Sequence, residues 1–150
     1  MRRGPAAITR AWCLFELTTA LDLGKVLHVA LSPADHAGFV ALLERDFFLN
    51  HLEELNLSDN DIADEGLRAL AAALGDGHLR KMTSLYLSAN KITNEGAFAL
   101  AAAAKGAKKL PELYDMRLDY QLVGWDGRRA IVEAFKERGQ KVSVILKNLE

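Results

Sequence analysis

A short frame of leucines followed by an asparagine occurs three times in this chain, and it limits the possible folds more than any other feature. The first copy runs from Leu52 to Ile62 (LEELNLSDNDI), and the second, from Met82 to Ile92 (MTSLYLSANKI), begins 30 residues later. A third and less regular copy, LYDMRLDYQLV, begins at Leu113, 31 residues after the second. Units of this length bury their apolar faces by stacking on one another. The frame therefore predicts a stack of units, which offers a surface for binding rather than a pocket for catalysis.

Each copy contains a run in which apolar and polar side chains alternate, which is the period of a β-strand. In the first copy we expect Leu55 and Leu57 to point inward and Asn56 to point outward. Strands of successive copies should pair in parallel, so that the outward side chains, with Glu54 among them, form rows across one face of the sheet. The residues predicted to bind a partner on that face are Asn56, Ser58, Ser84, Tyr86, Ser88, Asp115, Arg117 and Asp119. Tyrosine and arginine are enriched at interface hot spots, so Tyr86 and Arg117 are the strongest candidates.

An amide side chain follows each strand, and a glycine follows each amide six residues later. The amides belong to Asn60, Asn90 and Gln121, and the glycines are Gly66, Gly96 and Gly127. An amide can bond to backbone groups that a turn leaves unpaired, so we assign these six residues structural roles. Since Gln121 has a longer stem, we expect the third turn to be looser.

After each of these glycines, apolar residues four positions apart predict a helix. The pairs are Leu70 and Leu74, Leu100 and Ala104, and Ile131 and Phe135. The second helix is rich in alanine, which favours helix formation and lets neighbouring helices approach closely. Gly75, Gly106 and Gly139 are expected just beyond the helix ends, at the position where glycine commonly ends a helix. The predicted units are residues 52–81, 82–112 and 113–140, followed by a closing strand over residues 141–146.

The frame L-x-x-L-x-L-x-x-N-x-L resembles the ribonuclease-inhibitor-like leucine-rich repeats. The steps Asp64-Glu65-Gly66 and Asn94-Glu95-Gly96 before the helices add to the resemblance, which covers residues 52–150. It implies an α/β fold, a short solenoid with parallel strands on the concave face and helices on the convex face. It also implies a non-enzymatic module that binds another protein on the concave face.

Residues 32–51 are predicted to form a connecting helix that caps the first repeat. Ser32 is a suitable N-cap, Pro33 suits the first helical position, and Asp35 favours the helix start. A solenoid needs such a cap because its terminal repeat otherwise leaves apolar surface in water.

Residues 1–31 do not follow the repeat and are interpreted as a helix–strand stub, with a predicted strand over Lys25 to Leu31. The run from Arg10 to Leu17 (RAWCLFEL) resembles the W-C-L-x-E-L segment of Toll/interleukin-receptor (TIR) domains. In the enzymatic members of that family, the glutamate at the position of Glu16 acts in NAD cleavage. The elements that precede this segment in that fold are not in the chain, and such a glutamate works only inside a pocket that holds the substrate. We therefore predict no enzymatic activity, with Glu16 catalytic only where an upstream TIR-like domain exists.

Two alternatives remain open at this stage. The chain could be a fragment of a larger TIR-like NAD-consuming or signalling protein, or a truncated chain with no independent function. A lone helix–strand stub cannot make a sheet by itself, and the apolar residues of Val26 to Leu31 would then be exposed and invite association.

The composition and net charge indicate which classes of partner and which cell compartment to expect. The net charge of −1 and the pI near 6.4 give no electrostatic case for nucleic acid or an anionic membrane. One cysteine, Cys13, fits a reducing compartment, so we predict a cytoplasmic protein. The four histidines lack metal-ligand spacing, so no metal or cofactor is predicted. The acids of the first turn, Asp59, Asp61, Asp64 and Glu65, are interpreted as solvated.

Overall fold

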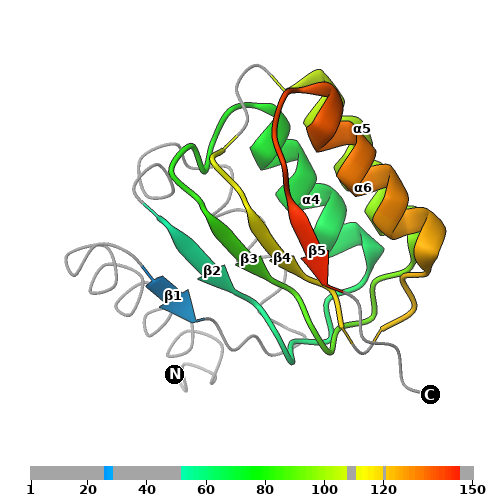
Figure 1. The fold of residues 1–150 in the computed structure, drawn as a ribbon. Helices are drawn as coiled ribbons and strands as arrows, with labels where there is room; N and C mark the ends of the chain where they lie inside the picture. The colour runs from blue at the N-terminus through cyan, green and yellow to red at the C-terminus, as the bar shows by residue number, and fades with distance from the viewer. Residues whose placement is uncertain (1–25, 29–51, 108–110, 120, 146–150) are drawn as a thin grey trace, which may run out of the picture.

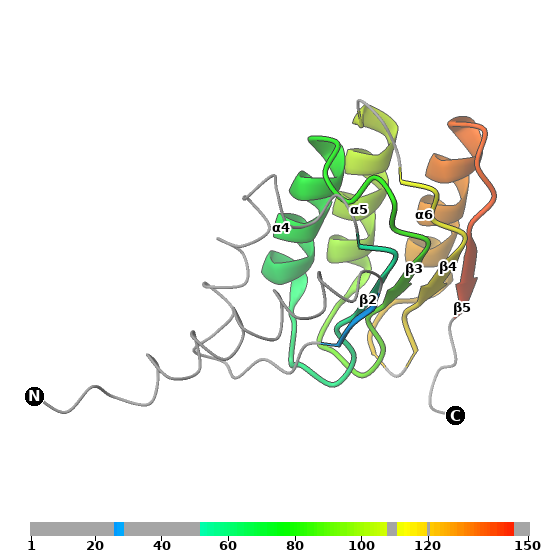
Figure 2. The same ribbon diagram turned by 90° about the vertical axis from the view of Figure 1, so that its left-hand side faces the viewer.

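The computed structural model describes residues 26–28, 52–107, 111–119 and 121–145. Within these ranges five short strands form one sheet, and every neighbouring pair of strands is parallel. The strands lie in chain order and are β1 (Val26–His28), β2 (Glu54–Asn56), β3 (Ser84–Tyr86), β4 (Asp115–Arg117) and β5 (Ser143–Ile145). Three helices alternate with them and are α4 (Asp64–Gly75), α5 (Asn94–Gly106) and α6 (Trp125–Glu137). The helices lie side by side on one face of the sheet (Figures 1 and 2).

The register of the strands confirms the predicted alternation of inward and outward side chains. Leu55, Leu85 and Met116 align across β2, β3 and β4, and all three are fully buried. The next residues along the strands, Asn56, Tyr86 and Arg117, also align but are buried only in part or exposed. The sheet therefore has one apolar face toward the helices and one polar face away from them.

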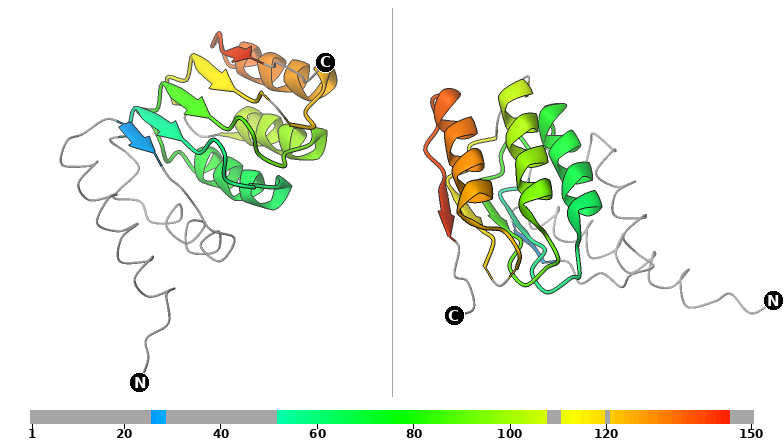
Figure 3. Two further views of the ribbon diagram at one scale, coloured as in Figure 1. Left: turned by 90° about the horizontal axis from the view of Figure 1, so that it is seen from below. Right: turned by 90° about the vertical axis from the view of Figure 1, so that its right-hand side faces the viewer.

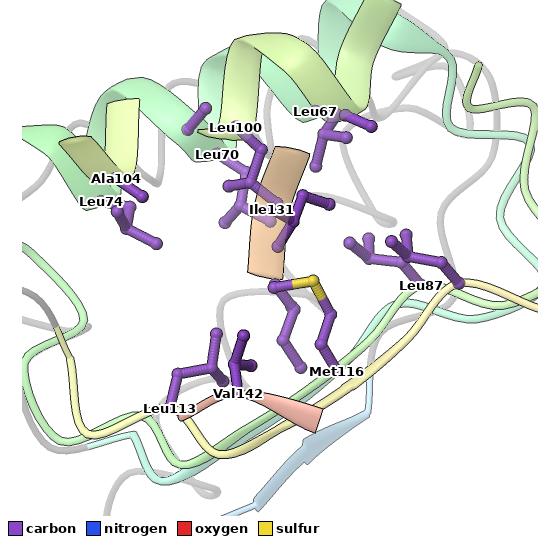
Figure 4. Packing of buried hydrophobic residues seen from close by; sticks show 14 of the residues in the cluster. Leu67, Leu70, Leu74, Leu87, Leu100, Ala104, Leu113, Met116, Ile131 and Val142 are labelled. Carbon is purple, nitrogen blue, oxygen red and sulfur yellow. The ribbon is translucent and has the colours of Figure 1, made fainter. Parts of the chain in front are cut away.

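The core fills the space between the sheet and the helices. The helix pairs predicted from four-residue spacing are all buried: Leu70 and Leu74, Leu100 and Ala104, and Ile131 and Phe135. Leu113, Met116 and Val142 come from the sheet layer and belong to the same buried cluster as the helix side chains (Figure 4). In α5 the buried stripe consists largely of alanines, and this helix lies between α4 and α6 (Figure 3). Small side chains allow the helices to pack on it from both sides.

The helix ends correct part of the sequence prediction. Gly75 and Gly106 are the last residues of their helices rather than the residues beyond them. After α4 the left-handed position is taken by Gly77, with φ of 86°, whose N–H donates to the carbonyl of Leu74. Gly139 has φ of 80° after α6, as predicted. The difference at Gly75 arises because a glycine that bonds within the helix needs no special backbone conformation, whereas the residue that reverses the chain does.

The strand expected near residue 26 belongs to the repeat sheet. Val26–His28 pairs in parallel with β2, in register from Val26 opposite Glu54 to His28 opposite Asn56. A lone stub was expected to be unable to make a sheet by itself, and its strand instead joins the sheet of the repeats, because β2 offers an edge whose backbone groups can bond to it. At the other end of the sheet β5 confirms the predicted closing strand. Glu16 and the predicted connecting helix over residues 32–51 lie outside the described residues, and the domain boundaries remain predictions.

Candidate functional site

The face of the sheet turned away from α4, α5 and α6, which we call the open face, carries three rows of side chains. The register places Glu54, Ser84 and Asp115 in one row and Asn56, Tyr86 and Arg117 in the next. Ser58, Ser88 and Asp119 follow two residues beyond the strands. These are the positions that the alternating pattern predicted to point outward.

Tyr86 and Arg117 form a stacked pair near the middle of the open face. The Arg117 Cζ atom lies 5.0 Å from the centroid of the Tyr86 ring, within the range of a cation–π contact. The Arg117 Nε atom lies 3.9 Å from Asp115 Oδ2, which adds a weak ion pair. The ring and the carboxylate together hold a guanidinium whose side chain is still 51% exposed. The sequence identified both residues but could not show that they contact each other.

The polar side chains beside this pair also make hydrogen bonds within the protein, some within one repeat and some between neighbouring repeats. Asn56 Oδ1 accepts the backbone N–H of Ser58 at 3.0 Å, which folds the Asn56 amide back on the turn. Ser88 Oγ donates to Asp119 Oδ2 at 3.4 Å. These contacts rigidify the face around the stacked pair.

Two of the predicted binding residues offer almost no surface. Ser84 is 5% exposed and Asp119 is 7% exposed, so the expectation that both are accessible is wrong. Ser84 is a short side chain flanked in its row by the longer Glu54 and Asp115, and Asp119 lies at the turn where Ser88 bonds to it. The accessible part of the predicted set is Asn56, Ser58, Tyr86, Ser88, Asp115 and Arg117.

The amide of Asn90 joins the first two repeats behind this face. Its Oδ1 accepts the backbone N–H groups of Asn60 at 3.1 Å and Ile62 at 2.9 Å. Its Nδ2 donates to the carbonyls of Leu57 at 2.9 Å and Leu87 at 2.8 Å. One buried side chain thus satisfies backbone groups of two successive turns, which is the role predicted for it.

The two other amides also bond to backbone groups. Asn60 Nδ2 donates to the carbonyl of Ser58 at 3.0 Å. Gln121 Oε1 accepts the N–H of Ile92 at 3.2 Å, and its Nε2 donates to the carbonyl of Leu87 at 3.0 Å. Gln121 is only half-buried, whereas Asn90 is buried. The third junction therefore has fewer bonds to its amide than the second, in the direction expected for the longer side chain.

Asp64 and Asn94 connect the start of each helix to the next repeat, which the sequence analysis missed. Asp64 Oδ1 accepts the N–H of Thr93 at 2.8 Å and of Gly96 at 3.1 Å, and Asp64 Oδ2 accepts the Thr93 hydroxyl at 2.7 Å. Asn94 Oδ1 accepts the N–H of Gly124 at 2.8 Å. Since Thr93 and Gly124 are the N-caps of α5 and α6, each acceptor satisfies the helix start of the following unit.

The interpretation of Asp64 as a solvated turn acid is therefore wrong. Burial alone raises the pKa of the Asp64 carboxyl, but the hydrogen bonds from Thr93 and Gly96 and the nearby Arg68 bring the pKa below its ordinary value. Its recurrence as Asn94 one repeat later, at the same step before a glycine, was the signal that could have revealed this role.

These acceptors also explain the glycines at the helix starts. A Cβ atom at Gly96 would lie 2.5 Å from Asp64 Oδ1, and one at Gly127 would lie 2.6 Å from Asn94 Oδ1. At Gly66 a Cβ atom would lie 2.7 Å from Ile62 Cγ2. Any larger residue at these positions must displace the side chain that it meets.

The described residues hold no group of three or more histidine, cysteine, aspartate or glutamate side chains that could bind a metal ion. Among the helices in the described ranges, none combines the length and the apolar character needed to cross a membrane.

Comparison with known proteins identifies the repeat. A family model described as Leucine Rich repeat matches residues 48–71 and 78–101, each of which contains one strand frame and the start of the helix that follows. No curated protein matches the chain. The matches support a leucine-rich repeat protein, and the parallel strands and alternating helices are consistent with a short fold of that kind.

Proposed function

We propose that this leucine-rich repeat protein is a non-enzymatic interaction module that binds a protein partner on its open face. Leucine-rich repeats are in general protein-interaction modules. In this proposal the sheet is the concave face of a short solenoid of the ribonuclease-inhibitor-like type, acting in the cytoplasm without a cofactor, nucleic acid or membrane. The observation that carries the proposal is the stacked pair of Tyr86 and Arg117 in the middle of the face.

The stacked pair has the properties of a binding hot spot. The Tyr86 ring supplies apolar contact area, and Arg117 supplies N–H donors that can bond to carboxylates or carbonyls of a partner. Because the ring and Asp115 already orient the guanidinium, less side-chain freedom is lost on binding. The residues sit on adjacent strands of one sheet, so their spacing is set by backbone hydrogen bonds rather than by a loop.

A matched pair of variants tests the proposal. Tyr86→Ala with Arg117→Ala removes an aromatic ring and a guanidinium from the open face. The control is Phe98→Ala with Arg68→Ala, which removes the same two kinds of group from the exposed surface of α5 and α4. Partners captured with the unaltered chain are first identified by quantitative mass spectrometry, and dissociation constants are then measured for the unaltered chain and both variants.

The open-face variant should weaken binding by more than about 1 kcal/mol, which is about fivefold or more in the dissociation constant, without lowering the melting temperature. The control variant should bind as the unaltered chain does. If the open-face variant binds as tightly as the unaltered chain, the proposal is contradicted. If only the Phe98 and Arg68 variant loses affinity, the binding site lies on the helix face instead.

The two alternatives raised by the sequence remain predictions. Catalysis of NAD cleavage depends on Glu16, which lies outside the described residues, and on a TIR-like domain upstream of it. Nicotinamide release by a longer parent protein, lost on Glu16→Ala, is the measurement that would support that alternative. A chain without independent function should fail to unfold cooperatively, which thermal denaturation checks.

A further inference from the structure

The last strand of the sheet, β5, has one edge that faces away from β4. The N–H of Ser143 donates to the carbonyl of Tyr114 at 2.8 Å, and the carbonyl of Ile145 accepts the N–H of Leu118 at 3.0 Å. In a parallel sheet successive residues turn their backbone groups to opposite sides, so the N–H and carbonyl of Val144 point away from β4. Backbone groups of this kind can pair with a strand from another molecule.

The carbonyl of Val144, which points away from β4, is hydrogen-bonded to Arg128. Its Nε atom donates to the carbonyl oxygen of Val144 at 2.9 Å. Its Cζ atom lies 5.2 Å from the Trp125 ring centroid, so the indole supports the guanidinium from one side. Trp125 itself is 72% exposed, although tryptophan is a large apolar residue that is usually well buried.

The equivalent positions in the first two repeats have a different role. The residue after the glycine is Leu67 in the first repeat and Ala97 in the second, and both are fully buried. Leu67 Cδ2 lies 3.2 Å from the Cβ position of Gly96, and Ala97 Cβ lies 3.0 Å from that of Gly127. These two residues therefore pack against the start of the next helix. In the third repeat the same position carries Arg128, a long cation that instead reaches the strand edge.

Trp125 departs from the repeat in the same way. It stands at the position of Asp64 and Asn94, whose oxygens accept the backbone N–H groups of the next helix start. An indole has a single donor and no acceptor, so Trp125 cannot perform this function. The third repeat therefore replaces both residues that contact the following helix start in the first two repeats. The replacements Trp125 and Arg128 contact each other, and Arg128 bonds to the edge of β5.

We propose that the Trp125–Arg128 pair guards the edge of β5 against strand addition by a second copy of this chain. Strand addition relies on main-chain hydrogen bonds, so it requires no particular side chains in the partner. Two copies of β5 can pair across a two-fold axis because each contributes the same edge. With Arg128 bonded to Val144, a second copy would have to displace the guanidinium before it could reach that carbonyl.

Substitutions of two arginines in α6 test whether the Trp125–Arg128 pair prevents strand addition at β5. Arg128→Ala removes the bond to Val144, whereas Arg129→Ala removes the same charge from the neighbouring position, where the side chain makes only an exposed ion pair with Asp126 at 3.4 Å. The full chain and both variants are examined by sedimentation velocity over a wide range of concentrations. Circular dichroism shows whether each variant is folded, and Arg128→Lys, which keeps the charge but not the planar group, provides a milder change.

We expect the sedimentation coefficient of the Arg128→Ala variant to rise with concentration, while the unaltered chain and the Arg129→Ala variant keep constant values. Hydrogen exchange supplies the second readout: the Val144 amide should become slower to exchange as the Arg128→Ala variant associates, because the added strand takes its N–H. A concentration-independent Arg128→Ala variant overturns the proposal, and so does an unaltered chain that associates equally. If Arg128→Ala does not fold, the same outcomes are read from Arg128→Lys.

Discussion

Substitution of Gly96 by alanine tests how the repeats are joined. The added methyl group would lie 2.5 Å from Asp64 Oδ1 and 3.2 Å from both Ile92 Cγ2 and Leu67 Cδ2. The carboxylate is the atom group that can move, and its movement breaks the bonds that it accepts from Thr93 and from Gly96 itself. The variant therefore weakens an inter-repeat connection while Asp64 and Thr93, whose side chains take part in it, are left unsubstituted.

Three contributions set the size of the effect. Loss of a helix-capping interaction costs about 1 kcal/mol, and crowding in a packed region costs about 1–3 kcal/mol. Alanine in place of glycine inside a helix stabilises the folded state by about 1 kcal/mol. We therefore expect Gly96→Ala to lower the free energy of unfolding by about 2 kcal/mol, with a fall in melting temperature of several degrees.

Urea denaturation followed by circular dichroism measures the change. Gly106→Ala is the control, because a methyl group at this last residue of α5 meets nothing within 4 Å and should leave stability unchanged or slightly raised. Asp64→Ala completes a double-mutant cycle with Gly96→Ala. Since the capping bonds can be lost only once, the double variant should be about 1 kcal/mol more stable than the sum of the single changes predicts. Equal stabilities of the Gly96→Ala and Gly106→Ala variants, or strict additivity in the cycle, would refute the reasoning.

Two further predictions concern the same junctions. Asn90→Ala should lower the free energy of unfolding by about 3 kcal/mol, because the buried N–H groups of Asn60 and Ile62 lose their acceptor. Gln121 is only half-buried, so Gln121→Ala should lower the free energy of unfolding clearly less in the same urea titration. The lowered pKa of Asp64 predicts a contribution to stability that is complete above the ordinary pKa of a carboxyl group and is lost as the pH falls through the lowered value in the folded state. Asp64→Asn should remove this part of the pH dependence, and an unchanged acid profile of unfolding would contradict the assignment.

Much of the architecture could be read from local patterns. The alternation in each strand frame predicted which side chains point inward, and Leu55, Leu85 and Met116 are all fully buried. The four-residue spacing predicted the buried stripe of each helix, and the asparagine position predicted the amide of Asn90 that satisfies the turns. These predictions succeed because side-chain direction in a strand or helix follows from backbone geometry over a few residues.

The contacts between repeats depended on the tertiary structure. Asp64 reads as a solvated acid in its own turn and becomes an acceptor only when the start of α5 lies beside it. Ser84 has the spacing of an exposed residue but is buried among longer neighbours from two other strands. The stacking of Arg117 on Tyr86 and the bond from Arg128 to Val144 also join residues from different elements.

The sequence by itself determined the repeat, the order of strands and helices, and the inward and outward faces, because each of these follows from the period of the side chains along the chain. Only the tertiary structure decided which polar groups bond to neighbouring repeats and which remain available to a partner. The physical reason is that a hydrogen bond or a stacked pair requires two groups within a few ångströms, and in a stack of repeats the second group comes from the next unit about thirty residues away.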